Sequence, residues 1–122
     1  LKAVTLHARA EDAAKMAAHR EQYDAAVSRA VANAATLEEL TLPFVQKGGV
    51  AIAWKGPGVA EEMTAARRAA FLLGGTVRGT VDAPIPGRED WTHVLLLTDK
   101  TGTTPKAYPR KAGTPNKKPL GQ

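Results

Sequence analysis

Short apolar runs alternate with longer stretches of helical spacing along this chain. Runs of strand length, rich in β-branched or small apolar residues, lie at residues 1–7, 23–28, 50–54 and 92–98, and an alternating run lies at 76–82. The run at 50–54 (VAIAW) is continuously apolar, which is typical of a central parallel strand. The small residues of 23–28 likewise predict a strand covered on both faces. The pattern therefore predicts five strands.

Two of the intervening segments have the composition of helices. Residues 8–20 are rich in alanine, with apolar positions at helical spacing. Residues 59–73 place apolar side chains on one face, carry two acids in the first turn and are followed by Gly74 and Gly75, which predict the end of a helix.

A third helix is expected near Thr36. Thr36 and Glu39 have the spacing of a capping box, in which each side chain binds the backbone N–H of the other residue. Pro43 is expected to shorten this helix, and Gly48 and Gly49 to end it.

The order of these elements predicts an α/β fold. Strands and helices alternate as far as the fourth strand, which favours a parallel sheet with right-handed crossovers. The connection at 83–90 is rich in proline and glycine and too short for a helix, so the last two strands are expected to be antiparallel.

The basic charge of the chain is concentrated at its C-terminal end. Residues 1–99 carry 11 Lys or Arg and 12 acids, whereas residues 100–122 carry six Lys or Arg, four prolines, three glycines and no acid. We therefore expect a folded body, 1–99, and a basic tail, 100–122, that builds no core of its own. Basic residues around an aromatic ring are typical of a segment that binds RNA or DNA. The alternative is that this tail only increases solubility. The expected RNA-binding residues are Lys106, Tyr108, Arg110, Lys111, Lys117 and Lys118.

Several classes of site are not expected. The chain has no cysteine, its histidines (His7, His19 and His93) are scattered, and no run of about 18 apolar residues occurs. We therefore expect no metal site, no disulfide and no membrane span. We expect a cytoplasmic location. Lys55 precedes the glycines of its loop, unlike the lysine of a phosphate-binding loop.

In an open α/β sheet, ligands bind beyond the carboxyl ends of the parallel strands. This rule selects the loops at 8–12, 28–30 and 55–58. Charged residues there are most often simply solvated, but three charged loops at one edge also predict a binding rim. Its candidate residues are Glu11, Arg29 and Lys55.

Four segments resemble motifs of one family, the bacterial small-subunit ribosomal RNA guanine-N7 methyltransferases, also called the glucose-inhibited division protein B family. Residues 104–120, TPKAYPRKAGTPNKKPL, are similar to its C-terminal signature. The triplet at 9–11 resembles its R-A-E turn, residues 23–32 its Y-D-x-x-x-[ST]-R-A-V-A strand end, and residues 49–56 its G-G-x-x-x-x-x-K-G strand.

The resemblance implies the C-terminal half of a Rossmann-like, class I S-adenosylmethionine-dependent methyltransferase. An upstream half would supply the glycine-rich cofactor loop, and the first residue, Leu1, also suggests a fragment. Carried over by position, Ala10 and Glu11 would border the adenine, largely through backbone groups, Arg29 would complete the cofactor rim and Lys55 would face the substrate. Family members often carry an arginine where this chain has Thr92. Arg88 is the nearest arginine.

The implied activity is S-adenosylmethionine-dependent methylation of a guanine N7 in 16S ribosomal RNA, free or in the small ribosomal subunit. Guanine N7 carries a lone pair and no proton. Methyl transfer to it therefore needs positioning and desolvation of the reactants and no general base. The alternative is a non-enzymatic RNA-binding or ribosome-associated module. A nicotinamide-dependent enzyme would need a G-x-G-x-x-G loop after a first strand.

Overall fold

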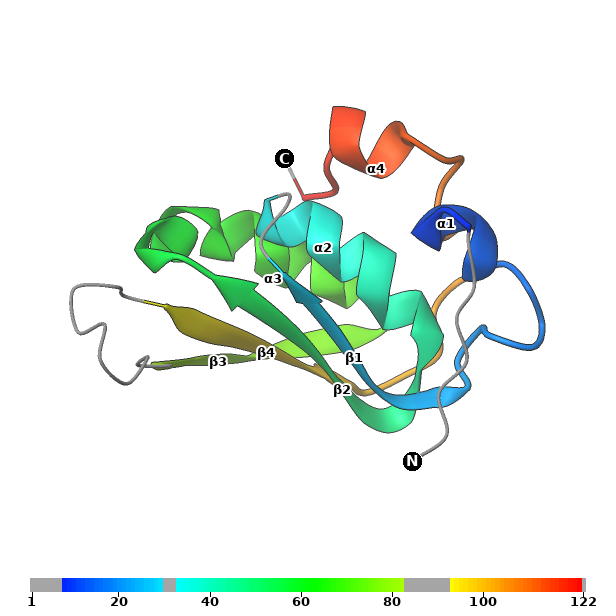
Figure 1. Ribbon diagram of the computed structural model, residues 1–122, viewed down its shortest axis with the longest axis horizontal. Coiled ribbons are helices and arrows are strands. Elements are labelled where there is room, and N and C mark those ends of the chain that lie inside the picture. Colours follow the sequence, from blue (N-terminus) through cyan, green and yellow to red (C-terminus); the bar gives the residue numbers. More distant parts are fainter. Residues whose placement is uncertain (1–7, 30–32, 83–92, 122) are drawn as a thin grey trace.

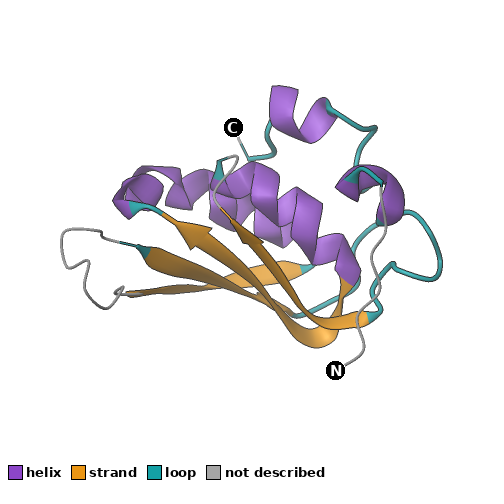
Figure 2. Cartoon of the chain, in the orientation of Figure 1, coloured by secondary structure: helices purple, strands orange, loops and turns teal. Residues whose placement is uncertain are grey.

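The computed structural model describes residues 8–29, 33–82 and 93–121 and shows one mixed sheet with helices on one face (Figures 1 and 2). The strands are β1 (Tyr23–Arg29), β2 (Val45–Lys55), β3 (Gly75–Asp82) and β4 (Val94–Lys100), in the spatial order β1-β2-β4-β3. The helical elements are α1 (Ala10–Ala13), α2 (Ala34–Thr41), η1 (Leu42–Phe44), η2 (Pro57–Glu62), α3 (Met63–Leu72) and α4 (Thr114–Lys117).

Strand directions follow from the connections. Strands β1 and β2 are parallel, with α2 and η1 between them in sequence, whereas β4 is antiparallel to both β2 and β3. The predicted strands at 23–28, 50–54, 76–82 and 92–98 are thus confirmed wherever they are described, as is the antiparallel last pair. The expected strand at 1–7 and the connection at 83–90 lie outside the described residues.

The core lies between the sheet and the helices α2 and α3. Alanines at 66, 69 and 70 bury one face of α3, and Leu42, Leu73 and Leu96 are fully buried. Small side chains on α3 allow close approach to its neighbours. After α3, Gly74 has φ +86°, and a Cβ on it would lie 2.8 Å from the carbonyl oxygens of Gly102 and Thr103. The predicted stop after α3 is therefore confirmed, and the site requires glycine.

Two expectations for the middle helix are wrong. Helix α2 begins at Ala34, where the side chain of Asn33 accepts a hydrogen bond from the Thr36 N–H at 2.9 Å, so Asn33 is the cap. The Thr36 hydroxyl instead donates to the Pro115 carbonyl at 2.9 Å. The α-helix ends before Pro43 as expected, but Gly48 and Gly49 lie within β2 and do not end it.

Strand β1 is exposed, in contrast to the expectation of a strand covered on both faces. Val27 is 71% and Tyr23 43% exposed, and β1 lies at one edge of the sheet that the described residues form. The helix expected at 8–20 is reduced to the single turn of α1, followed by irregular turns to Glu21, whose φ is +52°. In the described part of the chain, no helix has both the length and the hydropathy that crossing a membrane requires.

Candidate functional site

Arg29 and Lys55 are the last residues of the neighbouring parallel strands β1 and β2. Arg29 lies opposite Trp54 in the parallel register, and Lys55 is the next residue of β2. The Lys55 ammonium is buried and lies 3.0 Å from Glu62 Oε1. The same oxygen accepts the Ala34 N–H at 2.5 Å, so Glu62 ties the end of β2 to the start of α2.

A hollow of about 320 Å³ opens beside β1, between α1 and α2. Ala10, Ser28 and Arg29 line it together with the apolar side chains of α2 and Phe44. The Ser28 hydroxyl oxygen is buried and makes no hydrogen bond among the described residues. Because most of the side chains that line it are apolar, this hollow suits a ligand with an apolar ring. Ala10 and Arg29, expected from two separate motifs, are thus brought together.

The Glu11 side chain points elsewhere. It is buried, and its Oε2 accepts the Gly113 N–H at 2.7 Å and a 3.4 Å contact from Arg9. Burial raises the pKa of Glu11, but the hydrogen bond from Gly113 and the charge of Arg9 outweigh it and hold the pKa below its ordinary value. The carboxylate of Glu11 therefore secures the C-terminal segment, and only its neighbour Ala10 reaches the hollow.

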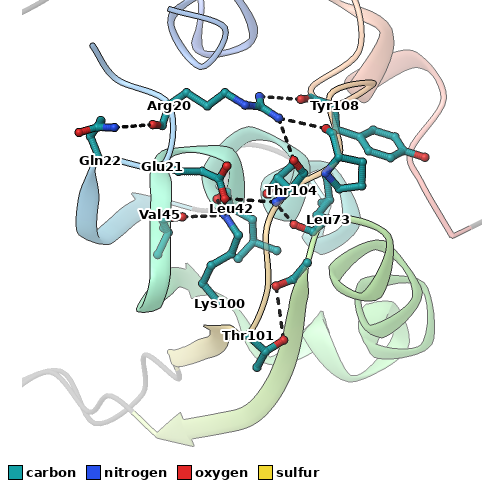
Figure 3. A network of polar contacts seen from close by, with 12 residues as sticks. Arg20, Glu21, Gln22, Leu42, Val45, Leu73, Lys100, Thr101, Thr104 and Tyr108 are labelled. Carbon is teal, nitrogen blue, oxygen red and sulfur yellow. Dashed lines mark hydrogen bonds and ion pairs between the residues drawn. The ribbon is translucent and has the colours of Figure 1, made fainter. Parts of the chain in front are cut away.

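Residues 101–121 pack against the body through contacts that the sequence did not reveal. The Arg20 guanidinium donates to the carbonyls of Tyr108, Thr104 and Pro105 at 2.8, 3.1 and 3.0 Å (Figure 3). Arg20 has no motif of its own, and its partners are more than 80 residues away. Its spacing in the sequence gave no signal that could have identified it.

Lys100, counted with the basic tail on charge alone, is the last residue of β4 and is buried. Its ammonium donates to the carbonyls of Leu42 and Val45 at 2.8 and 2.6 Å and lies 3.1 Å from Glu21 Oε2 (Figure 3). Burial lowers the pKa of Lys100 from its ordinary value, while Glu21 opposes that shift. The Lys100 charge is therefore structural and does not belong to an exposed cationic surface.

Arg110 pairs with the fully buried Glu39 of α2. Its Nη2 lies 2.7 Å from Glu39 Oε1, its backbone N–H donates to Oε2 at 2.8 Å, and Nη2 also donates to the Lys118 carbonyl at 2.6 Å. Hydrogen bonding to Glu39 raises the pKa of Arg110, against a smaller opposing effect of burial.

Tyr108 is half-buried against the core. The side chains of Lys106, Lys111, Lys117 and Lys118 are exposed. Contact with RNA stays a prediction for these residues, for Tyr108 and for Arg110.

A second acid of α2, Glu38, is buried against β4. Its Oε1 accepts a hydrogen bond from the Thr98 hydroxyl at 2.8 Å, and its Oε2 is buried without a hydrogen-bond partner in the described part of the chain. Burial raises the pKa of Glu38 to about 7, although the Thr98 hydrogen bond lowers it in part. The described residues hold no group of three or more His, Asp or Glu side chains placed to share a metal ion.

Comparison with known proteins places these features in context. Residues 1–85 match the family model described as "GidB: rRNA small subunit methyltransferase G". Proteins named ribosomal RNA small subunit methyltransferase G are similar to this chain over 115–116 residues. The identity is 50% for Clostridium botulinum (strain ATCC 19397 / Type A), 48% for Clostridium novyi (strain NT) and 46% for Clostridium perfringens (strain SM101 / Type A). The matches cover 94–95% of this chain but 47–48% of each relative. The chain thus spans about half the length of these relatives.

Proposed function

This chain belongs to the rRNA small subunit methyltransferase G family, and on that premise we propose that it forms the C-terminal half of an enzyme that methylates guanine N7 in 16S ribosomal RNA. The observation that carries the proposal is the joining of Ala10, Ser28 and Arg29 around one hollow, with Lys55 at the end of the adjacent strand. Two separate motifs, at 9–11 and 23–32, supply these lining residues.

S-adenosylmethionine, the proposed cofactor, supplies a methyl group on a positively charged sulfur. Ala10 and the apolar wall of the hollow suit its adenine, and Arg29 forms the rim. The remainder of the cofactor site belongs to the half of the relatives that this chain does not match.

Lys55 is proposed to donate a hydrogen bond to guanine O6. That contact orients the base and leaves N7 free to attack the methyl group, so no side chain has to remove a proton. Glu62 holds the Lys55 ammonium at 3.0 Å and thereby limits its range of positions. The exposed lysines at 106, 111, 117 and 118 would contact the phosphates of the RNA. The proposed location is the cytoplasm, where the small ribosomal subunit is found.

The test uses the chain itself and a fusion in which this chain replaces the matching half of the C. botulinum relative. Methyl transfer from labelled S-adenosylmethionine to 16S ribosomal RNA and to small ribosomal subunits is measured with the fusion. Lys55→Ala should lower turnover by about 100-fold, the effect typical of losing one stabilising donor. Lys47→Ala, an exposed lysine of the same strand, should leave it unchanged.

Each result has a defined meaning. Equal turnover of Lys55→Ala and the unaltered fusion would remove Lys55 from the reaction. A fusion that binds RNA, but gives neither methyl transfer nor heat on titration with S-adenosylmethionine, would identify a non-enzymatic RNA-binding module instead.

A further inference from the structure

Helix α3 presents an exposed aromatic ring between cations, on a face that the proposed site does not use. Phe71 is 81% exposed, the largest value among the exposed large apolar side chains of the described residues. Arg67 and Arg68 lie four and three residues before it, one helical turn away, and both are exposed. With Leu72 and Gly121 they line an open hollow of about 540 Å³.

This face is not a leftover of core packing. Ala66, Ala69 and Ala70 take the buried side of α3, so the exposed side carries the large residues, which is the reverse of a helix that only covers a core. Exposing a phenylalanine ring to water is unfavourable in free energy. Such a ring is typical of a binding surface when it belongs to a larger patch.

The charges of the face suit a polyanion. Helix α3 contains two arginines and no acid, and no ion pair between described residues involves Arg67 or Arg68. Arg68 makes one long contact, at 3.5 Å, to the Gly121 carbonyl. Both guanidinium groups are therefore available to an outside partner.

The C-terminal segment brings further cations to the same helical layer. Helix α4, which ends at Lys117, packs on the outer side of α2 (Figure 1), and the chain then runs to Gly121 against Ala65 and Arg68. Exposed Lys117 and Lys118 thus lie along the path that ends at α3.

We propose that Arg67, Arg68, Phe71 and Leu72, here called the α3 platform, bind an unpaired segment of RNA, with a base stacked on Phe71 and the arginines on the flanking phosphates. A ring beside cations is the arrangement by which proteins hold single strands, because every base has a face that can stack. The platform lies over β3, at the opposite edge of the sheet from β1 and its hollow, so it is a second contact remote from the proposed methyl-transfer site. The choice of RNA as the partner rests on the proposed function.

The test measures binding of a fluorescent, unpaired RNA decamer, and of the same sequence as a duplex, to the whole chain at several salt concentrations. Phe71→Ala should weaken decamer binding by about 5- to 100-fold without changing the salt slope, because stacking carries no charge. Arg67→Ala and Arg68→Ala should each lower the salt slope by about one. Phe71→Trp should retain binding, and its added fluorescence should be quenched by the decamer. Val81→Ala, an exposed apolar residue of β3, is the matched control.

The outcomes separate this proposal from the proposed function. Equal decamer affinity of Phe71→Ala and Val81→Ala overturns the platform while methyl transfer by the fusion stands. Loss of affinity in Phe71→Ala supports the platform even if the fusion transfers no methyl group. If Phe71→Ala instead changes the oligomeric state and not RNA binding, the face is a protein contact and the proposal is wrong. If the unaltered chain binds no decamer, the proposal is also wrong.

Discussion

Arg110 and Glu39 form an ion pair in which Nη2 lies 2.7 Å from Oε1 and Nε lies 3.1 Å from Oε2. Glu39 is fully buried, and Arg110 is about a quarter exposed. The pair joins the YPR part of the C-terminal signature to the middle of α2. The segment that resembles the C-terminal signature is therefore attached to the fold by an ion pair with a buried carboxylate.

Removing Arg110 should destabilise the whole chain. Arg110→Ala leaves the Glu39 carboxylate buried with only backbone hydrogen bonding, and we expect the free energy of unfolding to fall by about 3–5 kcal/mol. Urea denaturation followed by circular dichroism measures the change. Adding Glu39→Gln to Arg110→Ala should recover part of the loss. Lys111→Ala, an exposed neighbour, should change stability by less than about 0.5 kcal/mol, and a similar loss in that variant would contradict the role of the pair.

Replacing Arg20 should release the C-terminal segment. Arg20→Met keeps much of the apolar stem but loses the hydrogen bonds to the carbonyls of Thr104, Pro105 and Tyr108. Hydrogen bonds from a charged group are worth about 1.5–3 kcal/mol, so we expect trypsin to cleave after Lys106 at least about tenfold faster. Mass spectrometry of timed digests measures the rate. Lys15→Met, at an exposed position of the same segment as Arg20, is the control, and equal rates in the two variants would show that Arg20 does not hold the C-terminal segment.

Glu38 should make stability depend on pH near neutrality. Its folded-state pKa of about 7 lies above the ordinary value of 4.5, so the folded chain holds this proton more tightly than the unfolded chain does. The contribution of Glu38 is fully present below pH 4.5 and is lost as the pH rises through about 7. At higher pH the loss is on the order of 3 kcal/mol.

Glu38→Gln isolates this effect. The variant should be more stable than the unaltered chain at pH 8.5, and the difference should shrink or reverse at pH 5. Urea unfolding at both pH values measures it, with the exposed Glu61→Gln as the control. A Glu38→Gln variant whose stability followed the same pH dependence as the unaltered chain would show that Glu38 does not titrate in this range.

The exposed lysines of the C-terminal segment should act through charge alone. Replacing Lys106, Lys111, Lys117 and Lys118 together by alanine should lower the salt slope of RNA binding by about 3 and leave the unfolding free energy nearly unchanged. Deleting residues 106–118 would be a poorer test, because it also removes Arg110 and the buried Pro115. The control is Lys15→Ala with Lys47→Ala. An unchanged salt slope in the quadruple variant would leave these lysines with a solubilising role.

By itself, the sequence determined the strands β1 and β3, residues 50–54 of β2, most of β4 and the helix α3. The first residues of the helix predicted at 59–73 form the 3-10 helix η2 instead, and residues 45–49 extend β2. The correctly predicted elements have local causes. The strands follow continuous or alternating apolar runs, and α3 is followed by Gly74, whose positive φ favours glycine. The motifs at 9–11 and 23–32 were also sufficient to select Ala10 and Arg29, which the tertiary structure then placed around one hollow.

Only the tertiary structure decided what the charged residues do. Lys100, Arg110, Lys106 and Lys111 each count as one positive charge in the sequence. In the structure, Lys100 and Arg110 are held by Glu21 and Glu39, while Lys106 and Lys111 face solvent. Net charge along a chain does not indicate which cations find buried carboxylates, because such pairs join residues tens of positions apart. Exposure of β1 and of Phe71 has the same origin, since burial depends on which elements become neighbours and not on hydropathy alone.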